Sequence, residues 1–489
     1  MKNINKILVS GCFLIALGAC KKTVEGFDQD PNRFTTAKPE LILNAAEVSS
    51  LLVNEGNLAR YGGVWSRSFS GIDRQYVSVN NYNTTSGDFD SEWDNLFQAV
   101  ISQYKLVDEA ALKVNDKTLA GIAEVGMAQH LGLAADLWGD VPFSEVGDVI
   151  KFPTPKFETQ TQVYTKVQAL LDKAIVNLSA GVGNGPGAKD IFFGGDGASW
   201  LNVAYTLKAR FYLHSKDYQA ALTAASQGIS DPVGSMYGPH GQTYLSDFNV
   251  WYSFLTYDRP GYINGDDTYS VGLLDSSSTS YRGNSKTNET ARFNYLYQVG
   301  LNTGGTDPNV LCDFDWGVSN DETGFFGGNE KFPIVTYQEN LLIIAEANMK
   351  KGTPDPVASL AALNMYRAYL SDPSKTYIRS GYHSAGLQYD AYVSSDFNAG
   401  GIANPGTITA DEALLKEILE ERYITFIGQI EQFNDLRRTK NRLGISPITG
   451  TKLPQRFLYP QSEINTNPNT PKLTNADLFT ETFINKSPY

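Results

Sequence analysis

Two segments of this chain have the hydrophobic periodicity of paired antiparallel helices, and they limit the fold more than any other feature. In residues 198–229, apolar side chains from Trp200 to Phe211 recur on one helical face. Small alanines after the following turn allow a second helix to pack closely. Residues 337–370 repeat the pattern, with Asp355 as the N-cap of the second helix. A chain with two such hairpins is predicted to be mainly α-helical.

Each hairpin resembles a tetratricopeptide unit, in which two antiparallel helices form a repeat of about 34 residues. Such units stack on their neighbours and bury a continuous core. The predicted fold is therefore mainly α, a tetratricopeptide-like helical-repeat scaffold with long irregular loops. The longest of these loops is an insert over about 230–335, and a second covers 372–408. Long segments of this kind inside a domain are often functional.

The N-terminus has the pattern of a secretory signal. Lys2 and Lys6 precede an apolar run over residues 7–17, which is too short to span a membrane. The run ends in Leu-Gly-Ala-Cys, which resembles a bacterial lipobox. The alternative is an ordinary cleaved signal followed by a chance cysteine.

We therefore predict a lipoprotein signal peptide over residues 1–19, with Cys20 as the acylated N-terminus of the mature protein. Residues from about 20 to 36 are polar and lack periodicity, so they are predicted to form a tether. The whole of residues 20–489 is expected to form a single domain.

The C-terminal part of the chain is predicted to hold a buried charge. Thr409 fits the N-cap of a helix whose apolar stripe includes Arg422. An arginine that faces a core must be paired, because an unpaired buried charge is very costly. Glu431 and Asp435, just past Gly428, are the expected acids. Such a charged clasp is structural and indicates no function by itself.

Four sequence motifs carry a more specific signal. Residues 420–463 contain E-E-R-Y-I-x-F, then F-N-D-L-R-R, then R-F-L-Y-P-Q-S-E, and residues 135–143 read A-D-L-W-G-D-V-P-F. These motifs closely resemble the SusD/RagB family, in the branch described as starch-binding associating with outer membrane. One departure is Gln429-Ile430, where many relatives have Glu-Gly after the glycine.

The resemblance implies an outer-membrane lipoprotein of Bacteroidetes, exposed at the cell surface and not an enzyme. Such a protein would capture a nutrient and deliver it to a SusC-like TonB-dependent transporter. A glycan is the expected ligand, and an oligopeptide is the alternative within the family. A glycoside hydrolase is the alternative from another class, since two carboxylates are enough for that reaction.

The insert has the composition of a sugar-binding surface. Aromatic rings stack on the apolar faces of pyranose rings, while Asn, Asp and Arg bond the hydroxyls. Trp251 and Trp316, with Tyr252 and Phe325 near them in sequence, are the predicted ligand contacts. The alternative is that both tryptophans are buried and pin the insert to the scaffold.

Motifs for catalysis or metal binding are missing from the sequence. The four histidines are far apart, and neither G-x-S-x-G nor H-E-x-x-H occurs. We therefore predict no cofactor and no catalytic metal. Asp266-Asp267 and Asp313-Phe-Asp315 each supply oxygen ligands, so a structural calcium ion stays an open alternative. A formal net charge of −13 argues against nucleic-acid binding.

Overall fold

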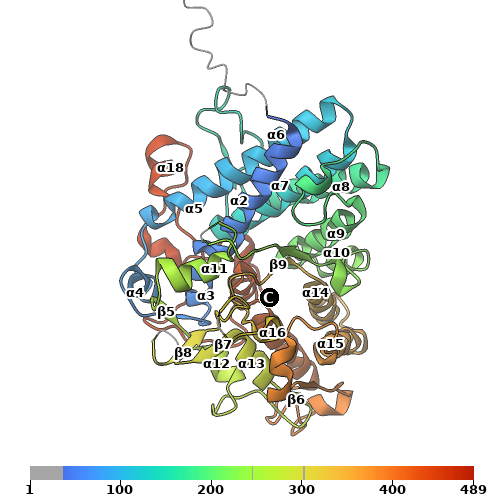
Figure 1. Cartoon of the computed structure of the whole chain (residues 1–489), viewed down its shortest axis with the longest axis vertical. Coiled ribbons are helices and arrows are strands. Elements are labelled where there is room, and N and C mark those ends of the chain that lie inside the picture. The colour runs from blue at the N-terminus through green and yellow to red at the C-terminus, as the bar shows by residue number, and fades with distance from the viewer. Residues whose placement is uncertain (1–36, 245, 301–302, 316) are drawn as a thin grey trace, which may run out of the picture.

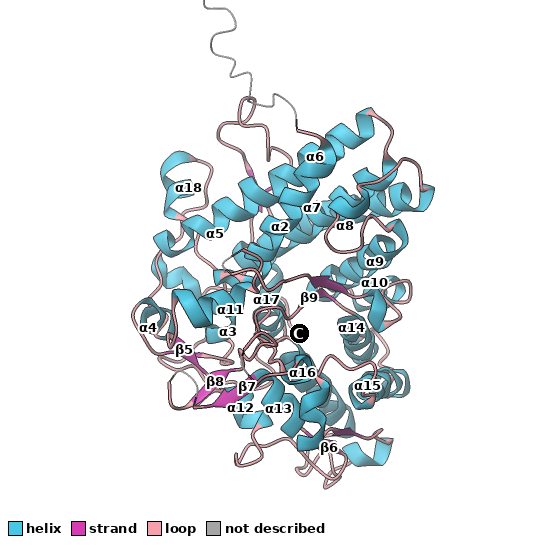
Figure 2. Cartoon of the chain, viewed as in Figure 1, coloured by secondary structure: helices cyan, strands magenta, loops and turns pink. Residues whose placement is uncertain are grey.

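The computed structural model describes residues 37–244, 246–300, 303–315 and 317–489. The predicted signal peptide, Cys20 and the tether lie outside these residues, as does Trp316. The described chain is mainly helical, with short strands in its loops (Figures 1 and 2). Of the helices in the described part, none is long and apolar enough to cross a membrane.

The N-terminal part forms a layer of helices around α7. Its elements are α2 (Pro39–Glu55), α3 (Asn57–Trp65), α4 (Gln75–Asn80), α5 (Asp90–Asp94), the π-helix η2 (Asn95–Ile101), α6 (Ser102–Lys113), α7 (Lys117–Trp138) and α8 (Gln160–Ala180). Helix α7 contacts α6, α8 and α9, so it is buried on nearly every side. Glycines make this close packing possible, because a Cβ on Gly132 would lie 2.2 Å from the ring of Phe211.

The two predicted hairpins are confirmed. They are α9 (Gly197–His214) with α10 (Tyr218–Ala225), and α14 (Tyr337–Lys350) with α15 (Pro356–Ser371). The side chain of Asp355 caps α15 by accepting from the backbone N–H of Ala358. Helix α10 packs on α14, so the hairpins stack into a column down the right side of Figure 1, from α8 to α15. The scaffold is therefore a helical repeat.

The insert over 230–335 is more structured than its composition suggests. It contains the short helices α11 (Val250–Ser253), α12 (Tyr269–Leu274) and α13 (Thr290–Leu296). Strands β4 (Met236–Gly238) and β9 (Phe332–Val335), near its two ends, pair with each other. Aromatic side chains spread along the insert are buried and hold each short element against the scaffold, so the insert is irregular, as expected, and still fixed in place.

The remaining strands form small antiparallel pairs that staple neighbouring loops. The pairs are β1 (Ser70–Gly71) with β5 (Ile263–Asn264), β2 (Val141–Pro142) with β3 (Phe157–Glu158), β6 (Thr287–Asn288) with β10 (Gln388–Tyr389), and β7 (Tyr297–Val299) with β8 (Thr306–Pro308). The C-terminal helices are α16 (Ala410–Thr425), α17 (Ile430–Arg438) and α18 (Gln461–Thr466).

The charged clasp joins α16, α17 and α14. The side chain of Arg422 is 1% exposed, and its Nε and Nη2 donate to the two carboxylate oxygens of Asp435 at 2.8 and 3.0 Å. Its Nε also lies 3.2 Å from Oε2 of Glu346 on α14. Arg438 pairs with the same two acids. Two guanidiniums therefore share two buried carboxylates, which leaves no net charge in this part of the core.

Glu431 does not contact Arg422 but belongs to a neighbouring cluster. Its carboxylate lies 3.4 Å from Nη1 of Arg210 and 3.3 Å from Nε2 of His214. Burial alone would lower the pKa of His214, but the carboxylates of Asp136 and Glu431 raise it to about 9. Asp435 is thus the acid that pairs with Arg422, and Glu431 ties α17 to α9 instead.

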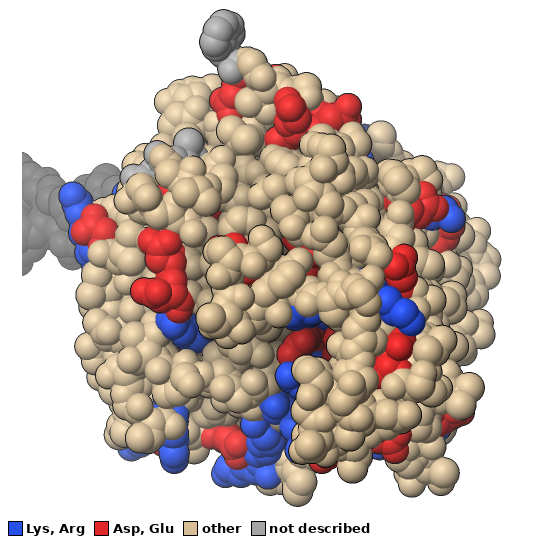
Figure 3. Space-filling model, turned by 90° about the horizontal axis from the view of Figure 1, so that it is seen from below, with Lys and Arg blue, Asp and Glu red and all other residues tan. Residues whose placement is uncertain are grey.

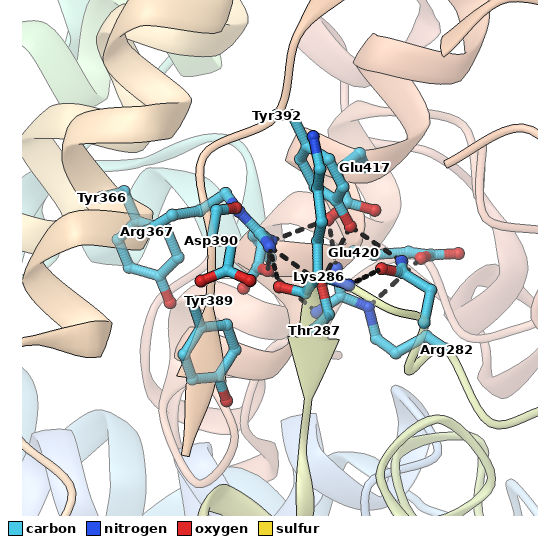
Figure 4. A network of polar contacts seen from close by, with 12 residues as sticks. Arg282, Lys286, Thr287, Tyr366, Arg367, Tyr389, Asp390, Tyr392, Glu417 and Glu420 are labelled. Carbon is cyan, nitrogen blue, oxygen red and sulfur yellow. Dashed lines mark hydrogen bonds and ion pairs between the residues drawn. The ribbon is translucent and has the colours of Figure 1, made fainter. Parts of the chain in front are cut away.

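A second charged cluster fastens the insert to the scaffold (Figure 4). Arg282 of the insert lies 2.7 Å from Glu417 and 3.5 Å from Glu420, both on α16. Arg367 on α15 donates through Nη2 to Oγ1 of Thr287 at 2.8 Å, close to the start of β6. Because these groups are buried, their ion pairs hold the insert, α15 and α16 in one arrangement.

Candidate functional site

Trp251 is a core residue and not a ligand contact. Its side chain is 0% exposed, and its ring lies 5.1 Å from the rings of both Phe69 and Phe326. The indole Nε1–H donates to the carbonyl of Gly428 at 3.2 Å. The prediction that Trp251 stacks on a ligand is therefore wrong, and the alternative, that it pins the insert to the scaffold, is correct for this residue.

The other two described candidates are also buried. Phe325 packs against Phe326 and Tyr295 within the core. Tyr252 is 3% exposed, so it offers almost no surface to a ligand. Both assignments as contacts are corrected, because the aromatic side chains of a short insert must first fill the space between it and the scaffold.

Tyr252 supports a set of aromatic rings that do reach solvent. We call Tyr244, Phe248, Tyr252, Tyr257 and Phe314 the aromatic platform. Its exposed members are Tyr244 (64%), Tyr257 (40%) and Phe314 (36%). Phe248 lies between the last two, with its ring nearly parallel to both, at interplanar angles of 7° and 12°. The insert therefore presents adjacent ring surfaces to solvent.

The backbone beneath the platform is held rigidly. The side chain of Asn249 accepts from the N–H groups of Trp251 and Tyr252 and so caps α11. The backbone N–H of Asn249 donates to the carbonyl of Gly328 at 2.7 Å. A Cβ on Gly328 would lie 2.6 Å from the ring of Phe314, so only glycine lets that ring settle here without a shift. Asn249 and Gly328 thus fix the backbone that carries the platform.

Polar groups lie at the edge of the platform. The amide of Gln242 donates to both carboxylate oxygens of Asp313, at 3.0 and 2.9 Å, and Asp313 directly precedes Phe314. An amide next to a carboxylate offers both a donor and acceptors. This combination, beside exposed rings, suits a ligand with apolar faces and hydroxyl edges.

Three of the four aspartates considered for calcium accept hydrogen bonds within the protein. Asp266 accepts from Nδ2 of Asn264 and from the backbone N–H of Thr306. Asp315 accepts from the backbone N–H of Cys312. Within the described residues, no three His, Cys, Asp or Glu side chains come together in a group that could hold a metal ion.

Comparison with known proteins agrees with this architecture. The SusD-like family model described as "Starch-binding associating with outer membrane" matches residues 31–237. A solved SusD/RagB family protein from Bacteroides thetaiotaomicron has the same fold over 93% of this chain and 100% of its own, at 19% identity and a TM-score of 0.66. The family match covers the N-terminal part of the chain, and the structural likeness extends the SusD fold over nearly all of it. The predicted fold class, a tetratricopeptide-like scaffold of SusD type, is confirmed.

Two other SusD homologues illustrate how far the fold is shared. A chitin-binding SusD homologue from Flavobacterium johnsoniae is 15% identical, covers 92% of this chain and 98% of its own, and has a TM-score of 0.61. A SusD homologue from Bacteroides fragilis is 16% identical, covers 92% and 99%, and has a TM-score of 0.63. At these identities the likeness establishes the fold alone. The search of curated proteins found no match.

The exposed platform residues were missed by sequence reasoning, although the sequence holds a signal for Phe314. Trp251 lies in the apolar run V-W-Y-S-F-L, whereas Phe314 stands between Asp313 and Asp315. A ring with charged neighbours on both sides is more easily left in solvent than one inside an apolar run. The prediction rested on the large ring of tryptophan, but the polarity of the flanking residues is the better indicator of which ring is exposed.

Proposed function

We propose that this protein is a member of the SusD/RagB family, a non-catalytic, surface-anchored lipoprotein that captures a glycan and delivers it to a SusC-like TonB-dependent outer-membrane transporter. The observation that carries the proposal is the aromatic platform. Its exposed Tyr257 and Phe314 flank the parallel ring of Phe248. Ring faces of this kind stack on the apolar faces of pyranose rings, while Gln242 and Asp313 supply partners for hydroxyl groups.

The family description and the chitin-binding homologue from Flavobacterium johnsoniae support a carbohydrate over an oligopeptide. An extended peptide is most often held by backbone hydrogen bonds along a strand edge, which a cluster of rings does not provide. Figure 3 supports the expectation that nucleic acid is not the ligand. On the face it shows, basic side chains are interspersed with acidic ones among a majority of uncharged residues, so no broad basic surface covers that face.

The test is to replace Tyr257 and Phe314 by alanine, singly and together, and to measure glycan affinity by isothermal titration calorimetry after an array screen. We expect each single change to weaken binding about tenfold, which corresponds to roughly 1.4 kcal/mol for one lost stacking contact. The control is Phe483→Ala, a ring that is more exposed, at 66%, and lies far from the insert in sequence.

Unchanged affinity in a folded double variant would overturn the platform as the binding site. Release of reducing ends from a polysaccharide by the pure protein would instead support a glycoside hydrolase. Binding of peptides but no glycans on the two kinds of array would favour the oligopeptide alternative.

A further inference from the structure

A concave site lies beside the platform. It is an open cleft of about 670 Å³, which we call the lateral cleft. Aromatic side chains from distant parts of the chain line it, among them Phe193, Tyr237, Tyr369 and Tyr377. Ligand pockets are typically about 300–1,000 Å³, so this cleft has room for a small saccharide.

Two backbone segments run from the lateral cleft to the platform. Tyr237 lines the cleft, and the same segment continues to Gln242 at the platform edge. On the second segment, Lys331 lines the cleft and Gly328 lies beneath Phe314. Gly328 and Lys331 are three residues apart, and three residues of backbone span at most about 11 Å. A single oligosaccharide can therefore reach both sites. The side chain of Asn249, at the start of α11, donates to the carbonyl of Glu330 at 3.2 Å and so holds the second segment beneath the platform.

The lateral cleft gathers cationic side chains in a protein whose net charge is −13. They are Lys331, Lys375 and Arg379, set against two acids in the lining, Asp231 and Glu330. Lys331 is exposed and pairs with no acid among the residues the structure describes. Lys375 is 59% exposed and has only a long surface pair, at 3.5 Å from Asp372. Both ammonium groups are therefore available to a ligand.

Arg379 is oriented by a buried carboxylate. Its Nε donates to Oε1 of Glu330 at 2.7 Å, and its Nη2 donates to the same oxygen. Glu330 is itself held by the hydroxyls of Thr323 and Tyr295. These contacts leave Nη1 of Arg379 without a hydrogen-bond partner among the described residues. A guanidinium fixed in this way can donate to an anionic oxygen.

We propose that the lateral cleft binds an anionic group, a carboxylate or a sulfate, on the same glycan whose neutral residues stack on the platform. The proposal rests on the proposed function and narrows the ligand to an acidic oligosaccharide. Lys331, Lys375 and Arg379 meet the anionic group, and the tyrosine rings and hydroxyls around them take the sugar that bears it. The lateral cleft is thus the part of the site that selects for charge.

The test uses matched probes and charge-removing variants. The probes are tetragalacturonate with its methyl ester, and a sulfated galactan oligosaccharide with its desulfated form. The variants are Lys331→Gln, Lys375→Gln and the double variant, which change exposed side chains and leave the core intact. The control is Lys113→Gln, an exposed lysine on α6. Affinities are measured by calorimetry at low and high salt.

We expect the wild-type protein to bind one acidic probe about tenfold more tightly than its neutral partner, and added salt to reduce that preference. The double variant should lose most of this preference, because only Arg379 still faces the anionic group, while the affinity for the neutral probe stays unchanged. Comparing the carboxylate pair with the sulfate pair shows which of the two anionic groups the lateral cleft binds.

Equal binding of acidic and neutral probes by the wild-type protein would overturn the inference and leave the platform intact. A preference of undiminished size in the double variant would do the same. Failure to bind any glycan, acidic or neutral, would overturn the proposed function together with the inference.

Discussion

Removing one buried charge from the cluster that fastens the insert should destabilise the protein in a pH-dependent way. Glu421 is fully buried, and its oxygens lie 2.9 Å from Nη1 of Arg282 and 3.0 Å from Nη1 of Arg292. Burial alone would raise the pKa of Glu421, but these guanidiniums and that of Arg367 lower it from 4.5 to about 2. A shift of this size corresponds to about 3 kcal/mol of folding free energy.

The pH dependence follows from the direction of the shift. The folded protein binds the proton less tightly than the unfolded chain, so the ionised carboxylate stabilises the fold above pH 4.5. This contribution is lost as the pH falls from 4.5 through 2. Glu421→Gln should therefore cost about 3 kcal/mol at neutral pH and roughly half of that near pH 3.

The assay is equilibrium unfolding in urea at pH 7 and pH 3, analysed as the change in the free energy of unfolding. Glu412→Gln is the matched control on the same helix. Glu412 is about half exposed, and its ion pair with Arg442, at 3.4 Å, is also exposed to solvent. It should change the stability by less than about 1 kcal/mol. A loss below 1 kcal/mol for Glu421→Gln, or one that does not change with pH, would refute the reasoning.

Three further predictions follow from the same structure. Arg422→Met should cost about 3–5 kcal/mol in urea unfolding, since it leaves the buried carboxylates of Glu346 and Asp435 with one guanidinium between them; a loss near zero would contradict the clasp. Trp251→Phe should lower stability by about 1–3 kcal/mol and leave glycan affinity unchanged, because the indole is buried and bonded to the core; lost affinity with full stability would contradict this. Cys20→Ser should yield protein without an acyl mass in intact-mass spectrometry of membrane extracts, and a wild-type protein lacking that mass would rule out the lipid anchor.

The helical scaffold is a property that local sequence determines. Apolar residues three and four positions apart place one face of a helix in the core wherever that helix packs. The caps Thr409 and Asp355 act on backbone groups within three residues of themselves. The burial of Arg422 is also local, because its position on an apolar stripe requires a core partner.

Which acid pairs with Arg422 was decided by tertiary structure. Asp435 and Glu431 are four residues apart and lie on the same side of α17, and only the packing of α17 against α16 and α9 assigns each acid to a different base. The same holds for the aromatic residues of the insert. A ring that fills a gap against Phe69, as Trp251 does, cannot be told from an exposed one by residue type, because the gap is made by another part of the chain.

The lateral cleft shows most clearly what the sequence alone does not determine. Its walls come from residues as far apart as Phe193, Lys331 and Lys375, which no spacing in the sequence relates. Periodicity is set by neighbours along the chain, so the sequence alone determined that this protein is a helical repeat with an aromatic insert. Exposure and the meeting of charges depend on surfaces brought together by folding, so only the tertiary structure decided which rings face solvent and where the cations gather.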